Sequence, residues 1–172
     1  PIIIGVTDVP VVLDRDNNHS PATAQEITAP CEVSGQLVAG DERDWVAIAA
    51  RRGEVFFIEG LGQRIASPVD LQISVLDAAG QQELALFGDE PRNIGGLFPT
   101  NHLDPSGRWV CPADGHYLLS IRNLIGGLNS DPRRIYRVSL RREEPDVRVV
   151  VVPRRDDLGG LNVKREIGRA HV

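Results

Sequence analysis

Apolar residues recur along the chain in short runs, and many of these runs alternate with polar residues. Alternation over about four to eight residues is typical of a β-strand with one buried face. The pattern predicts strands at Val33–Val38, Trp45–Ala49, Val55–Glu59, Leu71–Leu76, Leu84–Phe87, Arg108–Cys111, Tyr117–Arg122, Ile135–Leu140 and Val147–Val152.

Turn-forming residues separate these runs, as in Ala39-Gly40-Asp41 and Ala113-Asp114-Gly115. Short strands with such turns between them indicate an all-β fold, and we expect an antiparallel β-sandwich. One segment, Ala22–Ile27, favours a turn or two of helix, with Ser20 as the N-cap and Pro21 at the first helical position. A parallel α/β fold is excluded because no crossover helices are available.

The two ends of the chain differ from its middle. Residues 1–13 form an apolar stretch without an obvious hairpin partner, and Arg141–Pro145 is a charged linker. We therefore predict three parts: 1–13 as a connection from a preceding domain, 14–142 as the compact domain, and 143–172 as a linker with the first strands of a following domain. The absence of methionine agrees with an internal or processed piece of a longer protein.

Charge narrows the range of partners. The net charge of −5 combines 17 acidic and 8 basic residues in 1–130 with 7 acidic and 11 basic residues in 131–172. The acidic residues 1–130 would repel the phosphates of nucleic acid, so we expect no nucleic-acid partner. We expect the basic residues 131–172 to face acidic neighbours. No apolar run is long enough to span a membrane.

The residues that could carry chemistry are few. Cys31 and Cys111 form an even pair, for which a disulfide and two buried free thiols are both open. The chain has no Gly-x-Ser-x-Gly motif, and its four histidines are scattered, so we expect no enzyme. A hydrolase domain with an unrecognised site stays as an alternative.

Sugar binding is a second alternative. The long segment Gly88–Gly107 exceeds common loop lengths, and Trp109 follows it closely. Together they favour a carbohydrate-binding module in which Trp109 stacks on the ligand, whereas Trp45 is expected to enter the core. The low aromatic content, 5%, argues against a broad sugar-stacking face.

Five motifs, in order, resemble one protein family. They are Asp16–Ala24, Val33–Leu37, Gly40–Trp45, Val75–Gly80 and Pro112–Arg122. In this order they resemble the bacterial pre-peptidase C-terminal (PPC) domains, over about residues 14–141. The apolar flanks also resemble those of multi-domain exported proteins of planctomycetes.

The resemblance implies a jelly-roll-like β-sandwich that serves as a non-catalytic accessory module of a secreted, periplasmic or cell-surface bacterial protein. Adhesion, domain spacing or substrate association is then the expected role, with neighbouring domains of the same polypeptide and an extracellular protein or polysaccharide as partners. Related collagen-binding domains of clostridial collagenases bind calcium where the linker meets the sandwich. The positional counterparts here are Asp14, Asp16, Asn18, Asp41 and Asp44. The alternative is that these side chains cap turns and face water.

Overall fold

The computed structural model describes residues 5–90, 101–125, 129–143, 149–155 and 161–167. The chain divides into two compact units. The first comprises Pro1–Glu90 and His102–Glu143, and the second comprises Pro91–Asn101 and Glu144–Val172.

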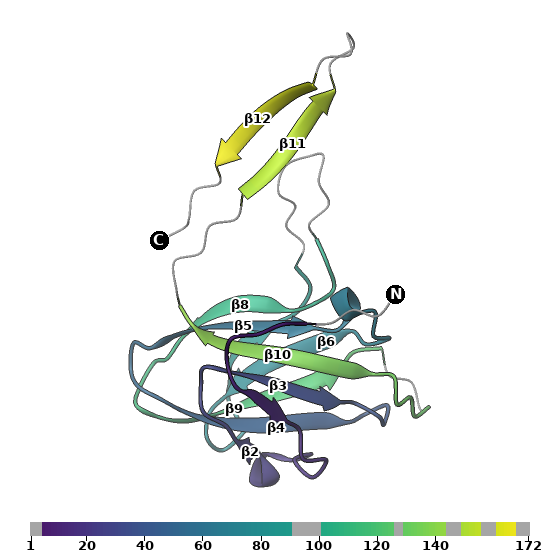
Figure 1. Ribbon diagram of the computed structural model, residues 1–172. Coiled ribbons are helices and arrows are strands. Elements are labelled where there is room, and N and C mark those ends of the chain that lie inside the picture. Colours follow the sequence, from purple (N-terminus) through teal and green to yellow (C-terminus); the bar gives the residue numbers. More distant parts are fainter. Residues whose placement is uncertain (1–4, 91–100, 126–128, 144–148, 156–160, 168–172) are drawn as a thin grey trace. The chain divides into compact units, whose positions relative to one another are not determined.

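The first unit contains two five-stranded sheets (Figure 1). One sheet has the order β1-β3-β10-β5-β8, and the other has the order β2-β4-β9-β6-β7. The bounds of the first are β1 Val11–Leu13, β3 Cys31–Gln36, β10 Ile135–Arg142, β5 Val55–Leu61 and β8 Ser106–Val110. Those of the second are β2 Gln25–Glu26, β4 Arg43–Ala50, β9 Gly115–Asn123, β6 Leu71–Leu76 and β7 Glu83–Phe87. The predicted all-β sandwich is confirmed.

The core lies between the sheets, and β6 and β5 each bury every second residue toward it. On β6, Leu71, Ile73 and Val75 are buried and the residues between them are half-buried. On β5, Phe56 and Ile58 alternate in the same way with partly exposed neighbours. This period of two is the pattern from which the strands were predicted.

The edges of the sandwich depart from the predictions. The β1 strand pairs in parallel with β3, so Val11–Leu13 belongs to the sandwich sheet although the domain was predicted to begin at residue 14. The predicted helical turn is a 3-10 helix, η1, at Pro21–Thr23 with Ser20 as its N-cap. It ends before Gln25–Glu26, which pair in parallel with β4 as β2.

The second unit contains an antiparallel hairpin of β11, Val149–Arg155, and β12, Leu161–Ile167. The predicted strand at Val147–Val152 is found from Val149 onward. Of the predicted long loop, residues 91–100 lie outside the described part of the chain. Within the described part, no helix is long and apolar enough to cross a membrane.

A buried carboxylate, Asp104, anchors the second 3-10 helix, η2, at Gln63–Ile65. Its Oδ1 accepts hydrogen bonds from the backbone N–H groups of Gly62 and Gln63, both at 2.7 Å. Its Oδ2 accepts from the N–H and the Nε of Arg64, at 3.0 and 2.8 Å. Burial raises the pKa of Asp104, but the bonds from Arg64 and the three backbone donors outweigh it and hold the pKa below its ordinary value.

Replacing Asp104 by Asn should lower the free energy of unfolding by about 2–4 kcal/mol at pH 7. Arg64 would lose its charged acceptor, and at least one backbone N–H would face the side-chain NH2 group of Asn instead of an oxygen. Since the folded pKa is lowered, the stabilisation is present above about pH 4 and is lost as the pH falls through the folded pKa. Urea denaturation of both proteins measures the effect. The matched control is Asp114→Asn, where an exposed carboxylate accepts one bond, from the N–H of Arg52; an equal loss there would contradict the special role of Asp104.

Candidate metal centre

The segment that follows β1 is fixed to both sheets by main-chain hydrogen bonds. The N–H of Asp14 donates to the carbonyl of Ser34 on β3, at 2.9 Å. Four residues later, the carbonyl of Asn18 accepts from the N–H of Trp45 on β4, at 2.8 Å, and its side-chain Nδ2 donates to the carbonyl of Trp45, at 3.1 Å. The segment therefore carries its polar side chains to the start of β4.

Asp44 stands at this point, fully buried near the beginning of β4. Its Oδ2 accepts a hydrogen bond of 2.7 Å from the hydroxyl of Tyr136 on β10, in the opposite sheet. A Cβ on Gly35 would lie 2.5 Å from this hydroxyl and 2.8 Å from the Cβ of Asp14. Glycine at position 35 thus leaves the space in which Asp14 and Tyr136 approach one another.

Four buried oxygens in this region have no hydrogen-bond donor among the described residues. They are both carboxylate oxygens of Asp14, Oδ1 of Asn18 and Oδ1 of Asp44. Buried polar atoms in proteins are almost always paired, because an unpaired one loses its water without compensation. Acceptors that lack donors in this way match the surroundings of a bound cation.

Two further side chains approach Asp44. His19 Nδ1 lies 3.4 Å from Asp44 Oδ1 and 3.6 Å from Glu42 Oε1, and one ligand atom from each of the three residues lies within 4.8 Å of the others. Neither His19 nor Glu42 was among the predicted ligands. Glu42 could have been predicted from its position two residues before Asp44, since residues two apart on an extended chain point to the same side.

The predicted ligands separate into two groups. Asp14, Asn18 and Asp44 supply the unpaired oxygens, whereas Asp16 and Asp41 are exposed. Asp16 has a positive φ of 54°, and its carbonyl lies 3.0 Å from His19 Nε2. Asp41 lies in the turn before β4, where it lines a surface hollow beside His19.

The electrostatics of the cluster show an excess of negative charge. Burial raises the pKa of Asp44 to about 7, and Asp14 and Glu42 add to the rise, while the hydrogen bond from Tyr136 and the nearby His19 oppose it. Burial lowers the pKa of His19, but the carboxylates of Glu42 and Asp44 outweigh it and raise the pKa above its ordinary value. A cation placed here would keep Asp44 ionised at neutral pH.

The donor set fits calcium. Calcium takes six to eight oxygen ligands from carboxylates, amides, carbonyls and water, and it tolerates irregular geometry. The unpaired atoms are all oxygens, and Glu42 adds another carboxylate beside them. His19 supplies the one nitrogen of the group, which is typical of zinc or other transition metals rather than calcium.

The other predicted sites have structural roles. Cys31 and Cys111 are buried free thiols. Of the two alternatives left open, the disulfide does not form, because β10 and β5 lie between β3 and β8 and separate the two cysteines by about 14 Å across the sheet. The alternative of two free thiols is the one found.

Trp109 does not face a ligand either. It is 5% exposed and packs between Phe56, with ring centroids 5.9 Å apart, and Tyr117, at 4.9 Å. The alternative in which Trp109 stacks on a sugar is therefore wrong. Trp45 is buried, as predicted.

No family model matches the chain, and no curated protein matches it. Among solved structures, the chain is similar to the pre-peptidase C-terminal domain of a collagenase from Bacillus anthracis, at 16% identity and a TM-score of 0.48, over 69% of this chain and 94% of that one. It is also similar to a periplasmic inhibitor of g-type lysozyme from Salmonella Typhimurium, at 12% identity and a TM-score of 0.46, over 70% and 99% of the two chains. The corresponding inhibitor from Aeromonas hydrophila gives 14% identity and a TM-score of 0.40, over 69% and 99%.

In calcium-free buffer with EDTA, the melting temperature should be higher at pH 5 than at pH 8, by about 5 °C. Because the folded pKa of Asp44 is raised, the folded state takes up a proton that the unfolded state does not bind, so stability is gained as the pH falls from about 7 toward 4. Differential scanning fluorimetry measures the difference, most of which Asp44→Asn should remove. The His19→Gln variant keeps Asp44 and should retain a difference. An unchanged pH dependence in Asp44→Asn would contradict the assignment to Asp44.

Proposed function

We propose that the sandwich is a non-catalytic accessory module of a larger exported or cell-surface protein, and that a bound calcium ion fixes its N-terminal linker, the segment after β1 that carries Asp14 and Asn18. The observation that carries the proposal is the set of buried oxygens without donors on Asp14, Asn18 and Asp44. Two of these residues belong to the linker and one belongs to β4, so one ion would join the two parts.

Such an ion couples the order of the linker to the folded sandwich. The linker residues reach the site only when β1 is paired with β3 and Asn18 is bonded to Trp45. Binding energy that depends on this arrangement stabilises it, by about 2.7 kcal/mol when calcium is at a hundred times its dissociation constant. The ion would then hold the segment that follows β1 against β4 and so support the pairing of β1 with β3, which suits a module that sets the spacing of its neighbours.

The chemistry of the cluster supports a structural role. Its described residues are carboxylates, an amide, a phenol and an imidazole, which suit the binding of a cation. Extracellular modules bind calcium with dissociation constants of about 10⁻⁴–10⁻³ M. The resemblance of the sequence motifs to PPC domains supports an exported location.

Calcium at 5 mM should raise the melting temperature of the 172-residue chain by about 10 °C over EDTA, because it binds only the folded state. Asp14→Asn and Asp44→Asn should each abolish most of this shift. Asp16→Asn and Asp41→Asn are matched controls, since they remove equal charge from exposed positions of the same segments, and both should retain it.

A second measurement tests the linker itself. Arg15 is exposed between Asp14 and Asp16, so trypsin can cut there when the segment opens. Calcium should slow this cleavage in the wild type and not in Asp44→Asn. The proposal would be contradicted by unchanged cleavage, by an absent thermal shift, or by an equal loss of the shift in Asp41→Asn.

A further inference from the structure

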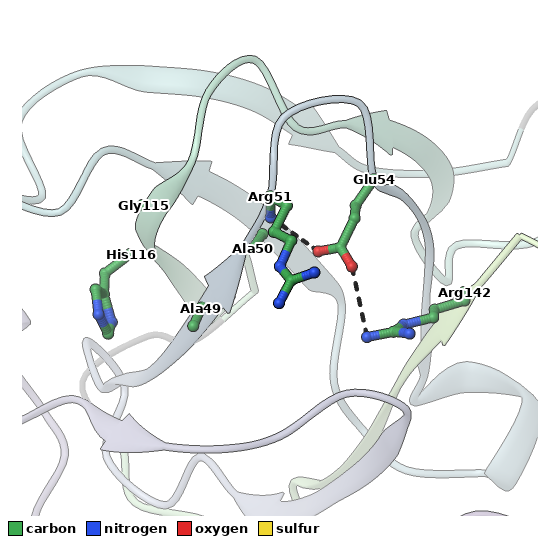
Figure 2. Close-up of a pocket in the computed structure, with 7 residues that line it drawn as sticks. All are labelled: Ala49, Ala50, Arg51, Glu54, Gly115, His116 and Arg142. Carbon is green, nitrogen blue, oxygen red and sulfur yellow. Dashed lines mark hydrogen bonds and ion pairs between the residues drawn. The ribbon is translucent and has the colours of Figure 1, made fainter.

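A pocket of about 580 Å³ lies at the end of β4 that is remote from Asp44 (Figure 2). Its lining includes Ala49 and Ala50 from the end of β4, and Gly115 and His116 from the start of β9. The backbone of these strands is paired here, with Ala49 opposite His116 and Ala50 opposite Gly115. Three of the four residues have small side chains or none, so a ligand can approach the strands closely.

Three cationic or basic side chains and one carboxylate surround this floor. They are Arg51, His116 and Arg142, with Glu54 between the two arginines in Figure 2. Glu54 Oε2 accepts a hydrogen bond from the backbone N–H of Arg51 at 2.8 Å, and its Oε1 lies 3.5 Å from Arg142 Nη2. The lining thus has a net charge of +1 with His116 neutral, on a chain whose net charge is −5.

Arg51 is the donor that this arrangement leaves free. Its backbone is held by Glu54, but among the described residues its guanidinium has no hydrogen-bond or ion-pair partner. Figure 2 shows the guanidinium between Ala49 and Glu54, with no interaction drawn to either of them. A guanidinium presents a planar set of donors that matches a carboxylate in a two-point hydrogen bond.

The neighbouring sheet edge is also open. β2 pairs with β4 only as far as Ala47, and Ala49 is exposed. An exposed strand edge can take up an extended peptide through main-chain hydrogen bonds. The lining contains no Trp, Tyr or Phe on which a sugar ring could stack, which favours a peptide over a saccharide.

We propose that this pocket binds an extended segment of an acidic peptide, with a glutamate or aspartate carboxylate of the ligand paired to the guanidinium of Arg51. The positive lining of Arg51 and Arg142 selects the acidic side chain, and the open edge of β4 at Ala49 receives the peptide backbone. This inference is independent of calcium, because Asp44 and the pocket lie toward opposite ends of β4.

The test uses a fluorescein-labelled peptide of six glutamates and the folded 172-residue chain in calcium-free buffer, since glutamate peptides bind calcium themselves. Fluorescence anisotropy should show saturable binding that a peptide of six glutamines does not reproduce. Arg51→Gln should weaken binding about tenfold, as expected for the loss of a charged two-point hydrogen bond, and Arg142→Gln should weaken it less.

The matched control is Arg52→Gln. Arg52 is an exposed neighbour that does not line the pocket, so its loss changes the net charge equally and should change the affinity less than twofold. Melting temperatures of all variants confirm that they are folded. The proposal is overturned by absent binding at millimolar peptide, by equal weakening in Arg52→Gln, by equal binding of the glutamine peptide, or by preferential binding of oligogalacturonate over the glutamate peptide.

Discussion

The hydrogen bond from Tyr136 to Asp44 is the interaction on which the arrangement of Asp14, Asn18 and the start of β4 depends. It joins β10 of one sheet to β4 of the other through a carboxylate that is fully buried. A buried carboxylate with one donor is a costly group to keep in a fold. Its other oxygen and the side-chain oxygens of Asp14 and Asn18 have no hydrogen-bond donor in the described part of the chain, so positive charge nearby would stabilise them. Among the described side chains at the site, the basic group nearest to Asp44 Oδ1 is His19, at 3.4 Å.

The central strands could be predicted from the sequence because their period of two is a local property. On β6, the alternation of Leu71, Ile73 and Val75 with polar neighbours is the burial pattern itself. The strands β1 and β2 could not be predicted in this way. They have three and two residues, and both pair in parallel with partners far along the chain, so no hairpin turn announces them.

The site residues also divide into those predicted from sequence motifs and those whose surroundings depend on the order of the strands. Asp14, Asn18 and Asp44 were predicted as ligands from motif order, and the structure brings them to the start of β4. The alternatives left open for Trp109 and for the two cysteines could not be decided from the sequence, because the surroundings of these residues depend on strand order. Placing β5 beside β8 buries Trp109 against Phe56, and placing β10 and β5 between β3 and β8 separates Cys31 from Cys111.

The strand β4 connects the two proposed sites, and its pairing explains how both can work without disturbing one another. All eight of its residues pair with β9, from Arg43 opposite Arg122 to Ala50 opposite Gly115. Its inward residues Val46 and Ile48 are buried in the core, so a sliding or tilting of the strand would open the packing between the sheets. Binding of a cation at Asp44 is therefore not expected to move the strand at Ala49. A module built in this way can hold its linker at one end and leave the other end free for a ligand.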